Sequence, residues 1–162
     1  MPKDVILTPE GLDKLREELE TLSTVRRREV AQRIKEAREF GDIAENSEYD
    51  DAKNEQAMLE TRIAGLEEKL RAATVVDASE ITTDVVQIGS VVNLKDEKTG
   101  NSLKYVIVGS TEADPKADPP RLSNESPVGR ALLGGKRNEI VSVQVPRGPA
   151  RKFKITKIDV GL

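Results

Sequence analysis

The stretch Gly41-Asp42-Ile43-Ala44-Glu45-Asn46 lies between two long helical patterns, where the chain is expected to reverse its direction. Upstream, Thr8-Pro9-Glu10 joins a capping hydroxyl to a proline suited to the first helical turn and an acid that favours the helix dipole. The pattern predicts one helix from there to about Phe40. Its apolar stripe consists of Leu12, Leu15, Leu19 and Leu22, and less regularly of Val25, Val30, Ile34 and Ala37.

The second helical pattern keeps a heptad rhythm without a break. An apolar seam on two of every seven positions is typical of a coiled coil rather than of a helix on a globular core. The seam is polar only at Gln56. Its members are Tyr49, Ala52, Gln56, Leu59, Ile63, Leu66, Leu70 and Ala73.

The two patterns match each other in one antiparallel register. Apolar residues then face apolar residues at nearly every layer, which predicts a hairpin within one chain and a rod of about 45 Å, given about 1.5 Å per residue. The predicted pairs are Ala37 with Tyr49, Ile34 with Ala52, Val30 with Gln56, Leu19 with Leu66, Leu15 with Leu70 and Leu12 with Ala73.

The rest of the chain predicts a small α+β domain with an antiparallel sheet. Two strand pairs flank turn-rich segments, and Ser126–Gly134 is expected to form a short helix that starts at a serine cap and ends at a glycine. The expected strands are 89–94 with 103–108, and 139–145 with 151–158. We therefore expect a coiled-coil hairpin over residues 1–76 and a second domain over residues 77–162.

Composition excludes several classes of function. The sequence has no cysteine and no histidine, which rules out disulfides, thiol nucleophiles, histidine bases and His/Cys zinc sites. Residues 1–76 carry 13 Lys and Arg against 18 Asp and Glu, whereas residues 77–162 carry 13 against 11. A net charge of −3 makes the chain a poor binder of duplex DNA by itself. No apolar run approaches the ~20 residues of a membrane span, so we expect a cytoplasmic protein without a membrane partner.

Charge is unevenly distributed at the predicted turn. Residues 42–51 contain five acids and no base, and a basic band that includes Arg33, Lys35 and Arg38 precedes them. One interpretation is helix punctuation, with Asp42 as the cap and Glu45 three residues later. The basic band would then be a solvated face with pairs such as Lys35–Glu39. In the other interpretation of the turn, the second helix starts near Ser47, and Asp42 and Glu45 project from a loop.

Two free carboxylates provide only some of the ligands that a metal site needs. Mg²⁺ retains several waters and needs further ligands, so Asp42 and Glu45 would hold it weakly by themselves. In two-metal phosphoryl chemistry, carboxylates position an ion and the attacking water. A long rod could bring both to a metal site in another protein.

Over essentially its whole length the chain resembles the bacterial Gre transcript cleavage factors, and among them the GreA type. Leu7-Thr8-Pro9-Glu10-Gly11 is similar to the family's approach to its first helix. Gly41–Asn46, followed by Tyr49 and Ala52-Lys53, resembles the signature of the hairpin tip. Ser126–Gly134 resembles the signature of the C-terminal domain, which in this family is FKBP-like. Ile43 and Ala44 depart from the family's more common Leu and polar or basic residue.

The resemblance implies a factor that is not itself an enzyme. The coiled coil would enter the secondary channel of a backtracked bacterial RNA polymerase. Asp42 and Glu45 would bind the second Mg²⁺ jointly with the polymerase, whose own active site cuts the nascent RNA near its 3′ end. The chain alone would hold no Mg²⁺ stably, and we expect it to be a monomer. Further implied contacts with RNA or polymerase are Tyr49, Arg33, Lys35, Arg38, Lys53, Ser126 and Pro127.

Three other functions remain open from the sequence. An inhibitory relative would use the same rod to block the channel, although such tips carry consecutive aspartates and this one has a spaced Asp42 and Glu45. A prolyl isomerase or chaperone would need an aromatic-lined pocket, for which residues 77–162 supply only Tyr105 and Phe153. A dimeric structural coiled coil is disfavoured because the seam is already satisfied within one chain.

Overall fold

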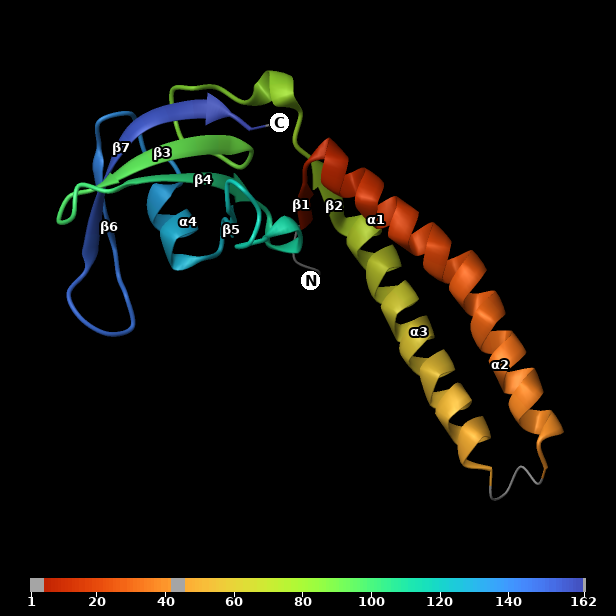
Figure 1. Cartoon of the computed structure of the whole chain (residues 1–162). Coiled ribbons are helices and arrows are strands. Elements are labelled where there is room, and N and C mark those ends of the chain that lie inside the picture. Colours follow the sequence, from red (N-terminus) through yellow and green to blue (C-terminus); the bar gives the residue numbers. More distant parts are fainter. Residues whose placement is uncertain (1–4, 42–45, 162) are drawn as a thin grey trace. The chain divides into compact units, whose positions relative to one another are not determined.

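The computed structural model describes residues 5–41 and 46–161 (Figure 1). It divides into two compact units, one formed by Leu12–Ala72 and the other by Met1–Gly11 together with Ala73–Leu162. The first strand thus belongs with the C-terminal half of the chain. Among the described residues, no helix is both long enough and apolar enough to cross a membrane.

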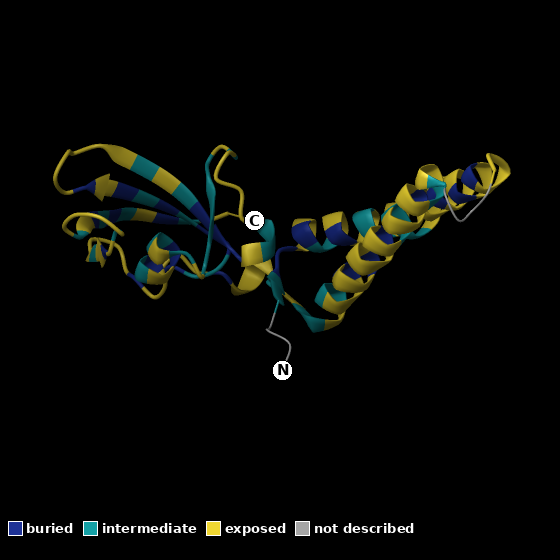
Figure 2. Cartoon of the chain, turned by 90° about the horizontal axis from the view of Figure 1, so that it is seen from below, coloured by how far each residue is buried: buried dark blue, intermediate teal, exposed yellow. Residues whose placement is uncertain are grey.

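The helical unit is the predicted antiparallel hairpin. Its first arm runs through α1 (Pro9–Thr21), the π-helix η1 (Leu22–Arg26) and α2 (Arg27–Glu39), and its second arm is α3 (Ser47–Ala72). The two arms lie side by side, and Figure 2 shows buried residues spaced along otherwise exposed helices. The buried cluster of the seam consists of Val30, Ile34, Ala52, Leu59 and Ile63, with Leu19, Leu22 and Tyr49 packed against it.

The π-helix explains why the first stripe is irregular. Leu22 and Val30 are eight positions apart, where a heptad seam requires seven. A π-helical turn takes up one extra residue relative to an α-helix, and η1 occupies this interval. Val25 consequently remains 46% exposed, while Val30 returns to the seam with 2% exposed. The bulge therefore keeps both halves of the first arm facing α3.

The second unit contains two sheets. In the smaller one, β1 (Val5–Leu7) and β2 (Ala73–Val75) pair in parallel. The larger is mixed, in the order β5-β4-β3-β7-β6, and only the β4–β5 pair is parallel. Its members are β3 (Ser90–Asp96), β4 (Ser102–Val108), β5 (Arg121–Ser123), β6 (Ile140–Val143) and β7 (Arg151–Val160). The remaining helices are η3 (Ala78–Glu80), η4 (Ser110–Glu112) and α4 (Pro127–Leu132).

One face of the larger sheet forms the core of this unit. Alternate residues of the central strands are buried there, and α4 adds Leu132, which has no exposed surface. The fold class is confirmed: an N-terminal helical hairpin precedes an α+β domain with a five-stranded sheet. The β1–β2 pair was missed, because three-residue apolar segments far apart in the sequence carry no pairing signal.

The bulge predicts an asymmetry between two single-residue deletions. Deleting Val25 makes the first stripe a regular heptad, so the hairpin should retain its helicity and its melting temperature within about 3 °C. Deleting Met58, which is 74% exposed, rotates Leu59 and Ile63 out of the seam. That variant should melt at least about 10 °C lower, since several core contacts are lost. Circular dichroism at 222 nm measures both, and equal destabilisation would contradict the bulge assignment.

Candidate functional site

The predicted tip acids Asp42 and Glu45 lie outside the described residues, and the structure describes both flanks. On the first arm, α2 ends at Glu39, and Phe40 follows it with 82% of its surface exposed. Gly41 has φ = 145°, a conformation that residues with a side chain rarely adopt. The helical path of the first arm therefore stops just before the predicted tip.

Asn46 begins the second arm and ties it to the first. Its Oδ1 accepts a hydrogen bond from the Tyr49 N–H at 3.2 Å, which is the geometry of a helix cap. Its Nδ2 donates to the carbonyl oxygen of Ala37 in α2 at 2.5 Å. The second start signal of the sequence is thus confirmed, because α3 begins at Ser47. The interpretation of Asp42 as the cap of this helix is wrong, because Asn46 occupies that position.

Tyr49 and Arg38, both predicted contact residues, are brought together at this end of the hairpin. The Arg38 guanidinium lies over the Tyr49 ring, 5.8 Å from its centroid, within the range of a cation–π interaction. The ring is half-buried and packs against the seam. Tyr49 therefore has a structural role at the last layer of the hairpin.

Much of the predicted basic band is paired across the hairpin. Arg27 donates twice to Glu60, at 2.9 Å each, and Arg26 and Arg33 both bind Glu55. The hydrogen bond from Arg27 lowers the pKa of Glu60, and the same bond raises the pKa of Arg27. These pairs are exposed, so each adds little to stability. The sequence interpretation considered only pairs along one helix and missed these acids of α3.

Two cations near the tip differ from the paired arginines. Lys35 and Arg38 have no carboxylate within 4 Å among the described residues, and Lys35 is exposed on α2. On α3, Lys53 donates to Gln56 at 3.1 Å and is also exposed. Lys35, Arg38 and Lys53 therefore supply positive charge near the tip that no described carboxylate pairs.

Ser126 and Pro127, the predicted contacts of the second unit, start α4. Ser126 Oγ accepts the N–H of Gly129 at 3.0 Å and donates to the carbonyl of Ser123 at 2.6 Å. Pro127 occupies the first turn and is exposed. A Cβ at Gly129 would collide with the carbonyl oxygen of Ser123, so only glycine fits there. The signature is thus largely explained by the folding of α4, and the exposed Pro127 remains available to a partner.

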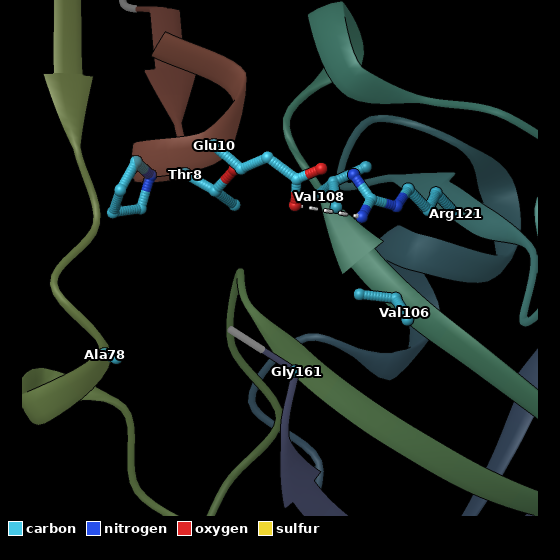
Figure 3. Close-up of a pocket in the computed structure, with 8 residues that line it drawn as sticks. Thr8, Glu10, Ala78, Val106, Val108, Arg121 and Gly161 are labelled. Atoms are coloured by element: carbon cyan, nitrogen blue, oxygen red, sulfur yellow. Dashed lines mark ion pairs between the residues drawn. The ribbon is translucent and has the colours of Figure 1, made fainter. Parts of the chain in front are cut away.

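A cavity of about 260 Å³ lies beside the first turn of α1, in the unit that contains the larger sheet (Figure 3). Its walls are mainly apolar, with Val106 and Val108 on one strand. In Figure 3, Glu10 and Arg121 point toward each other, and their charged atoms are 3.7 Å apart. No aromatic side chain is among the described residues that line the cavity.

A buried carboxylate fixes this first turn. Glu112, with 7% of its side chain exposed, accepts hydrogen bonds from Thr8 N at 2.8 Å and Thr8 Oγ1 at 2.5 Å. The Thr8 hydroxyl in turn accepts the N–H of Gly11 at 3.0 Å, which confirms it as the predicted helix cap. A Cβ at Gly11 would collide with the Glu112 carboxylate. The segment Thr8–Gly11 is therefore shaped around a residue about a hundred positions away.

Comparison with known proteins gives the family. The chain matches the N-terminal domain of the GreA/GreB transcription elongation factors over residues 5–75 and their C-terminal domain over residues 81–160. The chain belongs to the GreA/GreB family. It is 59% identical to the transcription elongation factor GreA of Acetivibrio thermocellus over 96% of both chains. It is 56% identical to GreA of Thermoanaerobacter pseudethanolicus over 98% of this chain and 99% of the relative.

A solved structure is also similar in sequence. The GreA factor homolog 1 (Gfh1) protein of Thermus thermophilus is 32% identical over 97% of this chain and 99% of its own, with a TM-score of 0.43. Gre factors stimulate the transcript cleavage that RNA polymerase itself performs. The predicted function class, a transcription elongation factor that is not itself an enzyme, is therefore confirmed at the level of the family, and RNA polymerase is its partner.

Asn46 should be important for the end of the hairpin. Replacing it by Ala removes both the cap of α3 and the bond to Ala37, which should lower the free energy of unfolding by about 1–2 kcal/mol. Asn46→Ser restores a cap but cannot reach Ala37, so its melting temperature should fall between that of the Asn46→Ala variant and that of the wild type. A melting temperature of Asn46→Ala equal to that of the wild type would contradict this role.

Glu112 should be important for the first turn of α1. Glu112→Ala leaves two donors of Thr8 without their acceptor in a buried position, which should cost about 1–3 kcal/mol. The control is Glu125→Ala, because that glutamate is exposed and precedes α4. In calorimetric melting of the full chain, Glu112→Ala should lower the transition temperature, whereas Glu125→Ala should leave it at the value of the wild type. Equal melting of the two variants would show that the Glu112 bonds contribute nothing net.

Proposed function

We propose that this chain rescues backtracked bacterial RNA polymerase by delivering Asp42 and Glu45 to the polymerase active centre. The hairpin enters the secondary channel with its tip first, and the polymerase then cleaves the nascent RNA. One observation carries the proposal: α2 ends at Glu39, and α3 starts under the cap of Asn46. The described residues account for both helix ends, and we propose that the acids within 42–45 serve the polymerase.

The donor chemistry fits a magnesium ion shared between two proteins. Carboxylate oxygens are the ligands that Mg²⁺ prefers, but two of them are fewer than a stable site needs. Among residues 5–41 and 46–161, no group of three or more Asp, Glu, His or Cys could hold a metal ion. Asp42 and Glu45 would therefore hold the ion only together with ligands of the polymerase. The bound ion would supply charge stabilisation and an activated water.

The neighbouring residues would bind and orient rather than hold the ion. Lys35 and Lys53 supply exposed positive charge for the 3′ end of the nascent RNA. Arg38 would contact the RNA while it keeps its position over Tyr49. Arg33 is engaged by Glu55, so an RNA contact from it requires that pair to open. Ser126 and Pro127 would contribute to docking of the second unit on the channel rim.

We also propose that the chain acts as a monomer in the bacterial cytoplasm. The seam residues of both arms are buried against each other, which leaves no continuous apolar stripe for a second copy on the described part of the hairpin. Prolyl isomerisation has no support, because Phe153 is buried and Tyr105 packs against the core. The remaining rival is an inhibitor that occupies the channel without cleavage.

Cleavage of RNA in stalled elongation complexes tests the proposal. Asp42→Asn and Glu45→Gln should each reduce stimulated cleavage roughly 100-fold, an effect typical of losing a group that positions water or metal. Glu48→Gln and Asp50→Asn are matched controls, because they remove the same charge from the first turn of α3. The controls should retain cleavage, and all four variants should compete with wild type for the polymerase.

Two outcomes would count against it. Equal loss of cleavage in the variants and their controls would show that general acidity of the tip matters, not Asp42 and Glu45. Inhibition of the polymerase by wild type without any RNA shortening would favour the channel blocker.

A further inference from the structure

Five lysines lie on one face of the larger sheet. Direct pairing places Lys95 of β3 beside Lys154 of β7, and Asn93 lies between Lys104 of β4 and Lys157 of β7. Residues paired across a sheet point to the same side, as do residues two apart in one strand. Lys152 therefore joins this group through Lys154. We call Lys95, Lys104, Lys152, Lys154 and Lys157 the lysine face.

The lysine face is opposite to the core. Leu94, Phe153 and Ile155 are buried on the other side of the same strands, and α4 packs there. A register shift between Asn93 and Leu94 keeps this alternation, because it lets Ile158 also point into the core while Lys157 points outward. Four of the five lysines are exposed and Lys154 is half-buried, so no described element covers this face.

The lysine face is not arranged to stabilise its own sheet. Opposite charges across strands stabilise a sheet and like charges directly opposite destabilise it, yet Lys95 and Lys154 are direct partners. The ion pair on this face joins Lys157 to Asp159 at 3.3 Å. The other four lysines have no carboxylate within 4 Å among the described residues. An anionic partner would relieve this repulsion.

From this face we infer a second binding surface, one for the phosphate backbone of duplex nucleic acid. Lysine is a compact point charge that suits phosphate contacts without base recognition. Single strands are bound on aromatic platforms, and the aromatic residues of this unit belong to the core side. Protein interfaces favour arginine and aromatic residues and are depleted in lysine, which argues against an acidic protein surface.

The dimensions suit contacts with a few phosphates. Two strand spacings separate Lys104 from Lys157, about 10 Å, and residues two apart in a strand advance about 7 Å. An area of this size is comparable to the grooves of B-DNA, which are roughly 6 and 12 Å wide. The helical unit is acidic, so binding should be weak and strongly dependent on salt. The surface is separate from the tip, and the inference does not depend on the proposed function.

Fluorescence anisotropy of a labelled 20-base-pair DNA duplex with the full chain tests this surface. Replacing Lys95, Lys104 and Lys152 by Gln should weaken binding at least tenfold at 50 mM salt. The slope of log affinity against log salt should fall by about 2–3, close to one per lost phosphate contact. The control replaces Lys69, Lys116 and Lys136 by Gln, which removes equal charge elsewhere, and its affinity and slope should change by less than half as much.

Measurements of stability and of polymerase binding distinguish a nucleic-acid surface from a surface that docks on an acidic protein. The lysine-face variant should melt no lower than wild type, because like-charge repulsion is removed. Equal loss of affinity in both variants, or no binding by wild type at 100 µM protein in 50 mM salt, would overturn the inference. It would also be overturned if the lysine-face variant kept its affinity for the duplex but lost affinity for core RNA polymerase, since the face would then dock on an acidic protein surface.

Discussion

The narrow apolar seam between the two arms of the hairpin is the constraint on which the candidate site depends. With few aromatic residues, the helical unit is held by one line of small and medium-sized apolar side chains. A single extra residue in one arm would turn half of that line toward solvent. The π-helix at Leu22–Arg26 takes up this residue and keeps both halves of the arm on the seam. The direction of the last turns of α2, and hence the start of the tip, follows from it.

Polar interactions at the two ends of the hairpin fix the helix ends, whereas the seam holds the two arms together. Asn46 joins α2 to α3 beside the tip, and Thr8 and Glu112 fix the first turn of α1. Both use a side chain to satisfy backbone groups that a helix end leaves without partners.

Charge is segregated between the two units rather than balanced within each. The helical unit pairs Arg26, Arg27 and Arg33 with glutamates of the opposite arm, whereas the lysine face of the sheet has little compensation. A net charge of −3 conceals this difference, because it averages an acidic rod and a basic sheet face. Electrostatic binding follows local charge, so the composition of the whole chain is a poor guide to where an anion would bind.

The sequence by itself determined the hairpin, the start of its first arm, four of the five strands of the larger sheet and the family. These features depend on local periodicity, on capping residues and on motifs that neighbours in the chain display together. Only the tertiary structure decided the rest. It paired β1 with β2, placed Glu112 under Thr8, neutralised Arg26, Arg27 and Arg33, and gathered the lysines on one face. Each of these requires residues far apart in the sequence to meet, and no local pattern records which partner the fold will supply.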